Sequence, residues 1–419
     1  MNLKKFALGF ALVLCAFTLM SSAAHAATLT VGNATSLPCT GTYSLISAAV
    51  AIASPGDTIQ VCPGIYNEQV SISKTLTLLG AKAGVDARTR ATTGESIINS
   101  PCGAVQIFAD SVVLDGFTIQ GSTDLDPCYI AGIYTNPGGF GYDGGYQVQN
   151  NIVQNNIIGM EMDNTGALPA KIEHNLFQNN NNTGPDGGTG IDTNFGANKV
   201  LVNANKFVGH TNSALGNFGG GSNLTFSNNE FAANRRAIGV FAITASTISG
   251  NNIHNSTGAD TADIRFFGGV SGVSITCNSL TSGAGIGIRI NDGCPGCPNS
   301  SITINNNNVS GYPVAGLQVD ALSYSGGPGS LDATNNWWGG STGPTIVTNP
   351  GGTGTAIVDP DGVVDYTPFR TSPSSCAPVL SIGPPTNKDQ CKNDGWKNFN
   401  TPRTFKNQGD CIQYVNTGK

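Results

Sequence analysis

The feature that most constrains the fold is an asparagine-centred pattern that recurs through the middle of the chain. In each copy an apolar residue is followed by two variable residues, then Asn, and two positions later a second apolar or aromatic residue. The copies are Val148–Asn151–Val153, Ile172–Asn175–Phe177, Val202–Asn205–Phe207, Phe226–Asn229–Phe231, Ile248–Asn251–Ile253, Ile275–Asn278–Leu280, Ile304–Asn307–Val309 and a degenerate Ala333–Asn336–Trp338. Successive asparagines lie 24, 30, 24, 22, 27, 29 and 29 residues apart, so the pattern marks a structural repeat.

Each repeat also contains a second short segment that begins with a small residue and an apolar one. Examples are Gly190-Ile191, Ala214-Leu215, Ala237-Ile238, Gly287-Ile288 and Gly316-Leu317. Period-two alternation is typical of strands, and a unit this short cannot bury its own apolar face. Parallel stacking solves the problem because each coil covers the next. We therefore predict an all-β fold, a single-stranded right-handed parallel β-helix of about 10–12 coils.

The fixed asparagine has a physical reason in such a stack. It lies where the chain bends between sheets, and Asn tolerates left-handed backbone better than most residues. Its amide can also bond the same amide one coil above and below. We predict a ladder of asparagines whose role is structural.

The N-terminal segment has the pattern of an export signal. Lys4 and Lys5 form a basic start, residues 6–20 are apolar, and Ala24-His25-Ala26 matches a cleavage site, so residues 1–26 are assigned to the signal. No later segment is apolar for long enough to span a bilayer. The β-helix is then expected over residues 27–367, with an amphipathic helix over 43–53 capping its open end.

The C-terminal part differs in composition. Residues 368–387 are rich in Pro and Ser and are predicted to be a linker. Residues 388–419 form a basic tail with two cysteines, similar to a short tail on other secreted bacterial proteins. Two roles stay open for this tail, a stable end piece or a handle for an acidic cell envelope.

The cysteines predict disulfide bonds. One of the 11 lies in the signal, and an even number in an exported chain indicates a disulfide framework. Nearness in sequence pairs Cys39 with Cys62, Cys102 with Cys128, and Cys391 with Cys411. The sequence leaves the partners of four cysteines open. They are Cys277, Cys294, Cys297 and Cys376, and a disulfide is favoured over a redox or metal site for Cys294 and Cys297.

Two segments resemble pectin-lyase-like β-helix proteins. The opening of that superfamily is similar to a first segment, made up of Ile46–Ala49, Pro55–Val61, Pro63–Glu68 and Leu78–Gly80. The closing coil of many secreted bacterial members is similar to a second segment, Asn335–Gly339 with Gly343-Pro344. The resemblance spans roughly residues 30–366 and implies the fold. It does not imply one activity, because the superfamily includes lyases, hydrolases, esterases, adhesins and binding modules. The later catalytic segments of pectin methylesterases and polygalacturonases are missing.

Stacking of the second strand predicts two outward columns of side chains. The first is Tyr134, Glu161, Asp192, Gly216, Gly239, Arg265, Arg289 and Gln318. The second is Asn136, Asp163, Asn194, Phe218, Phe241, Phe267, Asn291 and Asp320. Acids, glycines beside phenylalanines, and arginines thus follow one another along the same surface.

These columns predict a ligand-binding surface. We expect the glycines to form a shallow floor, Phe218 and Phe241 to stack on sugar rings, and Arg265 and Arg289 to bind carboxylates. The predicted ligand-binding residues are Tyr134, Glu161, Asp163, Asp192, Phe218, Phe241, Arg265, Arg289 and Trp337. The last of these, Trp337, is expected to point outward from the final coil, whereas Trp338 seals the core.

The acidic part of the surface allows two more interpretations. Glu161, Asp163 and Asp192 are candidate oxygen ligands for calcium, the only cofactor that the sequence suggests. Glu161 and Asp192 on neighbouring coils also approach the spacing of a retaining glycosidase pair. If the protein is an enzyme, its catalytic residues are expected among Glu161, Asp192, Arg265 and Arg289. The histidines His174, His210 and His254 are predicted to be ordinary surface residues.

The preferred function is that of a secreted or cell-surface protein, with a periplasmic location also possible, that binds a polysaccharide without cleaving it. The alternatives are a polysaccharide lyase or glycoside hydrolase acting on an acidic glycan, and a structural envelope protein. Loss of the signal removes two lysines and no acid, which moves the formal charge from −6 to −8. An acidic chain of this kind makes nucleic acid an unfavourable partner. We expect a monomer.

Overall fold

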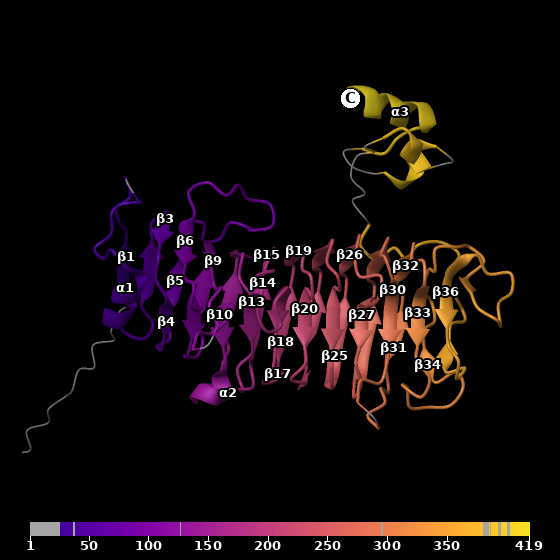
Figure 1. Cartoon of the computed structure of the whole chain (residues 1–419), viewed down its shortest axis with the longest axis horizontal. Coiled ribbons are helices and arrows are strands. Elements are labelled where there is room, and N and C mark those ends of the chain that lie inside the picture. The colour runs from indigo at the N-terminus through magenta and orange to yellow at the C-terminus, as the bar shows by residue number, and fades with distance from the viewer. Residues whose placement is uncertain are drawn as a thin grey trace, which may run out of the picture.

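The computed structural model is an elongated stack of parallel coils (Figure 1). It describes residues 26–379 apart from 37, 126 and 295, and then 385, 387–392, 395–399 and 403–419. The predicted export signal therefore lies outside the described residues except for its last position. In the described part of the chain no helix is long and apolar enough to cross a membrane.

The strands form three parallel sheets that run the length of the stack. Sheet A contains β1 (Thr28–Val31), β2 (Thr58–Val61), β5 (Thr77–Leu79), β8 (Val113–Asp115), β11 (Gln147–Gln149), β14 (Ala170–Glu173), β18 (Val200–Asn203), β22 (Thr225–Ser227), β25 (Ile243–Ser249), β28 (Ser271–Thr276), β31 (Thr303–Asn305), β34 (Leu331–Asp332) and β37 (Val364–Asp365), with β17 (Ala197–Asn198) and β21 (Gly221–Ser222) at its side. Sheet B contains β3 (Gly64–Tyr66), β6 (Ser96–Asn99), β9 (Phe117–Gln120), β12 (Ile152–Gln154), β15 (Leu176–Gln178), β19 (Lys206–Val208), β23 (Glu230–Ala232), β26 (Asn252–His254), β29 (Ser279–Thr281) and β32 (Asn308–Ser310). Sheet C contains β4 (Val70–Ile72), β7 (Val105–Ile107), β10 (Ala131–Thr135), β13 (Ile158–Met162), β16 (Thr189–Asp192), β20 (Leu215–Asn217), β24 (Ile238–Val240), β27 (Ala262–Phe266), β30 (Ile286–Ile290), β33 (Ala315–Val319), β36 (Gly354–Val358) and β35 (Pro344–Thr345).

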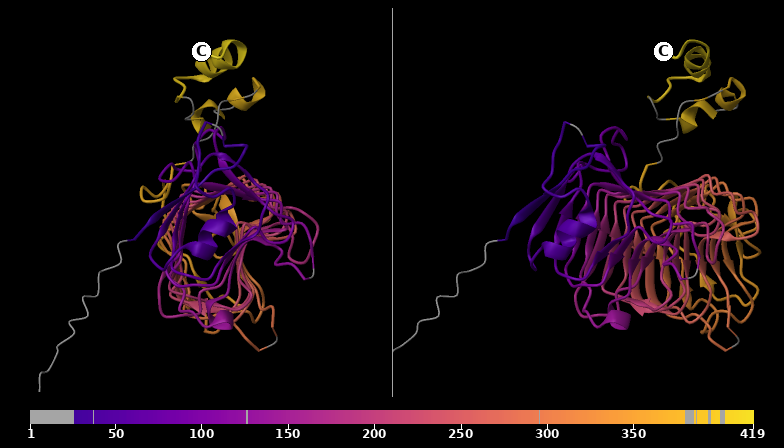
Figure 2. Two further views of the ribbon diagram at one scale, coloured as in Figure 1. Left: turned by 90° about the vertical axis from the view of Figure 1, so that its left-hand side faces the viewer. Right: turned by 60° about the vertical axis from the view of Figure 1, so that its left-hand side comes forward.

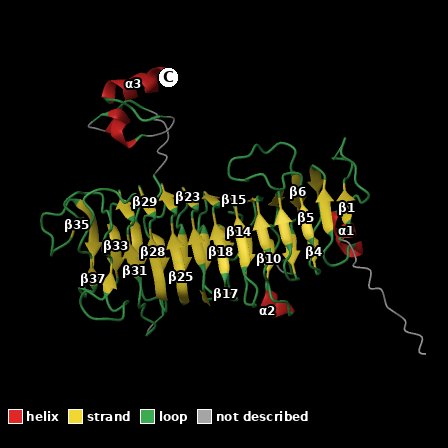
Figure 3. Cartoon of the chain, turned by 180° about the vertical axis from the view of Figure 1, so that it is seen from behind, coloured by secondary structure: helices red, strands yellow, loops and turns green. Residues whose placement is uncertain are grey.

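This topology confirms the predicted right-handed parallel β-helix. Every strand pair in the three sheets is parallel, and each strand pairs with the equivalent strand of the next coil, as Val202 of β18 does with Phe226 of β22. Apolar side chains of the repeat point inward and form one continuous core. Phe177, Phe207 and Phe231 stack there with ring centroids 5.1 and 4.9 Å apart. Strands dominate the molecule and helices are few (Figure 3).

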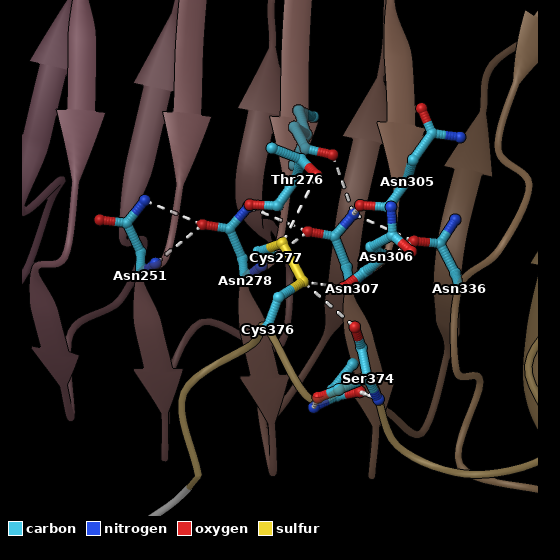
Figure 4. The surroundings of a disulfide bond; sticks show 12 residues. Asn251, Thr276, Cys277, Asn278, Asn305, Asn306, Asn307, Asn336, Ser374 and Cys376 are labelled. Atoms are coloured by element: carbon cyan, nitrogen blue, oxygen red, sulfur yellow. Dashed lines mark hydrogen bonds between the residues drawn. A yellow bond between two sulfur atoms is a disulfide. The ribbon is translucent and has the colours of Figure 1, made fainter.

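The asparagine ladder is present from Asn151 to Asn336. Asn229 is representative: its Oδ1 accepts the backbone N–H of Asn205 at 2.9 Å and the Nδ2 of Asn205 at 3.1 Å. Its own Nδ2 donates to the carbonyl of Val202 at 2.9 Å and to Oδ1 of Asn251 at 3.0 Å. The same contacts repeat in Figure 4 for Asn251, Asn278, Asn307 and Asn336. Each amide therefore joins three successive coils.

One part of the explanation for the ladder was wrong. The left-handed residue at each bend is the one before the ladder asparagine, with φ of 54° at Asn150, 57° at His174, 53° at Ala204 and 54° at Asn228. The ladder asparagine itself is needed for its amide, not for its backbone freedom.

A second ladder, on the other side of sheet B, was not predicted. The Oδ1 of Asn180 accepts the backbone N–H of Asn156 at 3.2 Å, and the Oδ1 of Asn234 accepts that of His210 at 3.0 Å. The His210 ring takes the place of one amide and lies against Asn180 and Asn234. His210 is therefore fully buried, not a surface residue as predicted, and burial lowers its pKa to about 4.

The predicted capping helix is α1 (Ile46–Ile52), which lies across the open end of the stack (Figure 2, left). Its first turn is held by Glu68, whose carboxylate accepts the N–H groups of Ile46 at 2.7 Å and Ser47 at 2.9 Å. Lys74 closes the other end by donating to the carbonyls of Ala51 and Ala53. These charges complement the helix dipole at both ends.

The disulfides complete the framework. The three predicted pairs Cys39–Cys62, Cys102–Cys128 and Cys391–Cys411 are confirmed. The structure adds Cys277–Cys376 and Cys294–Cys297. The first of these ties the segment after the last coil to a bend of the stack (Figure 4). Ser374 also donates its N–H to Asn308 Oδ1 at 2.7 Å, so the first part of the Pro- and Ser-rich segment lies fastened on the coils.

The C-terminal tail has its own small core. It contains η1 (Asp389–Cys391), η2 (Gly395–Asn398) and α3 (Gln408–Thr417). Phe399 and Phe405 pack around the buried Cys391–Cys411 disulfide. A piece of this size needs such a covalent bond to keep its shape.

Replacing a ladder asparagine is expected to destabilise the whole stack. Asn229→Ala leaves the buried backbone N–H of Asn205 without its acceptor and removes one donor from the carbonyl of Val202, which costs about 1–3 kcal/mol. Urea unfolding measures the change, with Asn212→Ala, a partly exposed asparagine outside both ladders, as the control. Equal stability of the two variants would contradict the ladder's role.

Candidate functional site

The outward surface of sheet C, here called the sheet C face, carries the predicted columns. Tyr134 pairs with Glu161, Glu161 with Asp192, Gly239 with Arg265, and Arg265 with Arg289. The alternate residues of the same strands belong to the core, so the column residues point away from it. The predicted register of the first column is therefore confirmed.

The second column continues past the ends of the strands. Backbone hydrogen bonds from Phe241 to Asn217, from Phe267 to Val240 and from Asn291 to Phe266 keep the coils in register there. The second column, predicted as a second row of outward side chains, lies along the edge of the sheet where its strands end.

The three acids of the sheet C face are buried, although the sequence predicted outward-facing contacts. Glu161 is 7% exposed, Asp192 1% and Asp163 0%. The Nδ2 of Asn194 lies 3.4 Å from Oε1 of Glu161 and 3.4 Å from Oδ2 of Asp192, and so bridges the two carboxyl groups. Asp163 bonds to the hydroxyl of Thr193 instead.

Burial changes the protonation of all three carboxyl groups. Desolvation, with Coulombic repulsion from Asp163, raises the pKa of Glu161 to about 7. Desolvation, with repulsion from Asp186 and Glu161, raises the pKa of Asp192 to about 7, and desolvation raises that of Asp163 to about 6. Like charges held out of water on neighbouring coils explain these directions.

The acids offer oxygen atoms to a cation but do not converge as a single site. Oδ2 of Asp163 and Oδ1 of Asp192 are buried without a hydrogen-bond partner among the described residues. Yet the ligand atoms of Glu161, Asp163 and Asp192 do not all lie within 4.8 Å of one another. The arrangement does not fit a calcium ion held by all three carboxylates at once.

Tyr134 belongs to an aromatic cluster beside the acids. Its ring stacks on Tyr129 with centroids 4.1 Å apart, and Phe108 lies 6.2 Å from it. Phe140, at the end of α2 (Pro137–Phe140), packs on Phe108 at 4.4 Å and is 48% exposed. Phe140 is thus the most accessible ring of this cluster, whereas Tyr134 itself is buried.

The predicted glycine floor is filled by side chains. A Cβ atom on Gly216 would lie 2.9 Å from the Phe218 ring, and one on Gly239 would lie 3.2 Å from the Phe267 ring. Phe218 and Phe267 meet edge to face at 5.5 Å across the coil between them. The two glycines therefore make room for aromatic rings of this protein and form no open floor.

Two arginines flank this aromatic packing. The guanidinium carbon of Arg265 lies 4.4 Å from the centre of the Phe267 ring, and that of Arg236 lies 5.0 Å from it. Arg236 is buried, and its guanidinium donates to Ser213 at 2.9 Å and Thr261 at 3.2 Å. Desolvation and the charge of Arg265 lower the pKa of Arg236 to about 10.

These arginines differ from Arg289 in their partners. Arg289 is paired with Asp320 at 2.7 Å, whereas Arg265 donates to the neutral Asn291 at 2.9 Å. In the described part of the chain no carboxylate lies within ion-pair distance of Arg236 or Arg265. The charge of the partly exposed Arg265 is therefore available to an anion, whereas Arg236 is buried beside it. Arg236 was not predicted because it precedes its strand and lies outside both predicted columns.

Trp337 lies apart from the other candidates. It bridges to Asn308 of β32 and so belongs to the sheet B side of the last coil. Trp338 is fully buried and seals the core as predicted.

Phenylalanines that follow strands of sheet C form an aromatic row. Phe108, Phe218, Phe241 and Phe267 come directly after β7, β20, β24 and β27, whereas Phe195 lies three residues beyond β16 and Phe140 lies in α2 after β10. The coil of β13, between β10 and β16, has Asp163 at this place and contributes no ring. Phe195 is 58% and Phe218 37% exposed. The sequence predicted only Phe218 and Phe241 as contacts, although Phe108 and Phe267 also follow a strand directly.

Comparisons with known proteins add likenesses of fold. No protein-family model matches the chain, and no curated protein sequence matches it. Among solved structures, an α-1,3-glucanase catalytic unit from Streptomyces thermodiastaticus is similar at 15% identity and a TM-score of 0.47, covering 78% of this chain and 67% of that one. The pectate lyase Pel9A gives 14% and 0.41, covering 85% and 92%, and the mannuronan C-5 epimerase AlgE4 A-module of Azotobacter vinelandii gives 13% and 0.43, covering 78% and 94%.

The buried acids are expected to make stability depend on pH. The pKa of Asp192 rises from 3.8 to about 7 on folding, so its protonated form is favoured in the folded state. The stability that this group contributes is complete below about pH 4 and is lost as the pH rises through 7. Asp192→Asn, which cannot ionise, should therefore exceed the wild type by about 1–3 kcal/mol at pH 8 and show no gain near pH 4.

Urea unfolding at both pH values measures this difference, and Asp124→Asn, at an exposed position, serves as the control. A variant that is less stable than the wild type at pH 8 would mean that the Asp192 carboxylate has a stabilising partner.

Proposed function

We propose that the protein is an exported, monomeric polysaccharide-binding protein that holds its glycan along the sheet C face without cleaving it. The observation that carries the proposal is the aromatic row, which supplies a ring on six of the seven successive coils from β7 to β27. Sugar rings present apolar C–H faces that stack on aromatic side chains, and parallel coils lie about 4.8 Å apart. A row that follows the coils in this way suits an extended chain of sugars.

The arginines support an acidic glycan as the ligand. Arg265 is partly exposed on the Phe267 ring, and its charge is not neutralised by a carboxylate of the described chain. Arg236 lies beneath the same ring and adds to the positive field. A guanidinium group binds carboxylates and sulfates through paired hydrogen bonds.

Burial of the acids speaks against catalysis. Glu161 and Asp192 have the raised pKa values that a general acid needs. A reacting sugar, however, must reach the carboxyl oxygens, and Asp192 is 1% exposed. The proposal therefore gives these acids no role in bond cleavage.

The disulfides agree with an extracellular or periplasmic location. Five disulfides, one of them holding the tail, are typical of an oxidising compartment. Arg403 in the tail is paired with Asp410 at 2.9 Å. For the tail we favour an end piece that its disulfide keeps folded.

Removing two rings of the row is expected to weaken glycan binding. Phe218→Ala combined with Phe241→Ala loses about 1 kcal/mol at each ring, so affinity should fall about 10- to 30-fold. Affinity electrophoresis in gels that contain acidic or neutral polysaccharides measures the effect, after a glycan array has chosen the polysaccharide. Ile52→Ala, an exposed apolar residue on α1, is the control.

Product analysis on the same glycan separates binding from catalysis. New reducing ends, or unsaturated sugars that absorb in the ultraviolet, would show that the protein is an enzyme and overturn the proposal. Absence of retention on every glycan tested would overturn it as well and would favour a structural role.

The two exposed arginines are expected to contribute unequally. Arg265→Gln should reduce affinity for the acidic glycan about tenfold and weaken its dependence on salt, because an unpaired charge is lost. Arg289→Gln should have a smaller effect, since Asp320 already neutralises Arg289. Titration calorimetry at two salt concentrations compares the variants, and equal losses would contradict the assignment.

A further inference from the structure

The bend that joins β16 to β17, residues 193–196, is fastened to the buried acids of the sheet C face. Oδ1 of Asp163, from the preceding coil, accepts the N–H of Phe195 at 3.1 Å and the hydroxyl of Thr193. The side chain of Asn194 adds its contacts with the other two acids. Phe195, at 58% the most exposed ring of the aromatic row, therefore stands on a segment that the acids hold in place.

The ring of the next coil depends on the same bend. The carbonyl of Thr193 accepts the N–H groups of Phe218 at 3.1 Å and of Gly219 at 3.0 Å. A Cβ atom on Gly216 would lie 2.9 Å from Oδ1 of Asp192 and 2.9 Å from Cε2 of Phe218. A carboxyl oxygen and the Phe218 ring thus lie side by side over one glycine.

Burial leaves the acid cluster, defined as Glu161, Asp163 and Asp192, incompletely satisfied. Oδ2 of Asp163 and Oδ1 of Asp192 have no hydrogen-bond partner among the described residues. In the part of the chain that the structure describes, no lysine, arginine or histidine forms an ion pair with the cluster. A carboxylate that is buried without a cation is costly, so ionisation favours an arrangement in which water reaches these oxygens.

The other titratable groups that face the acid cluster do not compensate its charge. Asp186, in the loop before β16, adds a further negative charge to the repulsion within the cluster. Tyr134, Tyr142 and Tyr146 also face it, and burial raises the pKa of each phenol above its usual value of 10. The phenols therefore stay neutral around pH 7, where the cluster changes its charge.

We propose that the acid cluster positions Phe195 and Phe218 for the ligand of the sheet C face: while it is protonated it holds the bend 193–196 closed, and when it ionises the bend opens. The inference rests on the proposed function, because both rings belong to the aromatic row. The acids are then positioning residues that affect glycan binding through the rings. Binding is expected to be stronger below neutral pH than above it.

The direction of the pH effect follows from the pKa values of the buried acids. Burial and repulsion raise the pKa of Glu161 and of Asp192 to about 7, whereas the same carboxyl groups in water have pKa values of 4.5 and 3.8. The closed bend therefore binds more protons than the open one. The stability that these protons give to the closed bend is complete below about pH 4 and is lost as the pH rises through 7.

Amide hydrogen exchange of the full-length protein without a glycan tests the opening of the bend. After correction for the intrinsic effect of pH on exchange, the opening constant at the N–H groups of Phe195 and Phe218 should rise about 100-fold between pH 6 and pH 8, about tenfold for each acid that titrates near pH 7. In Glu161→Gln combined with Asp192→Asn, the rise should shrink to about twofold, because only Asp163 still titrates.

Two controls separate local opening from a general loss of stability. Amides of β22 report global unfolding and should exchange more slowly than those of the bend at both pH values. Asp263→Asn removes a similarly buried acid of β27, whose carboxyl accepts the hydroxyl of Tyr312 and whose pKa burial raises to about 6. This variant should keep the wild-type response of the bend.

Affinity electrophoresis in gels that contain polygalacturonate, used as the acidic probe, relates the bend to binding. The wild type and Asp263→Asn should be retained about three- to tenfold more weakly at pH 8 than at pH 6, because only the closed bend presents both rings. Glu161→Gln combined with Asp192→Asn should be retained about equally at both pH values.

The inference is overturned if the opening of the bend does not depend on pH, if the double variant keeps the wild-type rise, or if the bend exchanges no faster than β22. Equal retention of the wild type at both pH values overturns it as well. Absence of retention at either pH, together with the expected exchange, would instead count against the proposed function and leave the anchoring of the bend established.

Discussion

The shared amide of each ladder asparagine is the interaction on which the rest of the structure depends. One oxygen accepts two N–H groups from the coil before it, and one Nδ2 group donates to two coils at once, as at Asn229. The buried bend between sheets A and B would otherwise leave backbone groups unpaired, a cost that recurs on every coil. The ladder therefore fixes the register of the coils between Asn151 and Asn336.

Register in turn determines the sheet C face. Because every coil repeats in place, residues from eight coils become neighbours in a line, and the order of acids, aromatic rings and arginines along the sequence becomes an order in space. Gly216 and Gly239 show how closely the sheet C face is packed, because they allow Phe218 and Phe267 to meet across an intervening coil. The same packing places the guanidinium groups of Arg236 and Arg265 on the Phe267 ring. Neither arginine forms an ion pair with a carboxylate of the described residues.

The sequence predicts those features of the structure that depend on the repeat. Spacing and alternation were sufficient for the fold, the ladder, the capping helix and the first column, because these follow from local pattern and stacking. Spacing and alternation were not sufficient to predict which outward side chains are buried. Asp192 was expected to be exposed since it points outward, yet it is 1% exposed. His210 replaces an amide in a second ladder. Its other members, Asn156, Asn180 and Asn234, lie five residues after asparagines of the first ladder and keep their spacing, but the second ladder covers only four coils and ends before Ser256. Arg236 lies in the loop between β23 and β24, where sequence periodicity does not show which way a side chain points.

Amide hydrogen exchange tests the ladder most directly. The backbone N–H groups of Asn205 and Asn229 lie at bends, where exchange is usually fast, but each donates to a buried amide oxygen of the next coil. They should exchange only on global unfolding, as slowly as the core strands β18 and β22. Exchange as fast as in the exposed loop 325–329 would contradict the stacked register and, with it, the arrangement of the sheet C face.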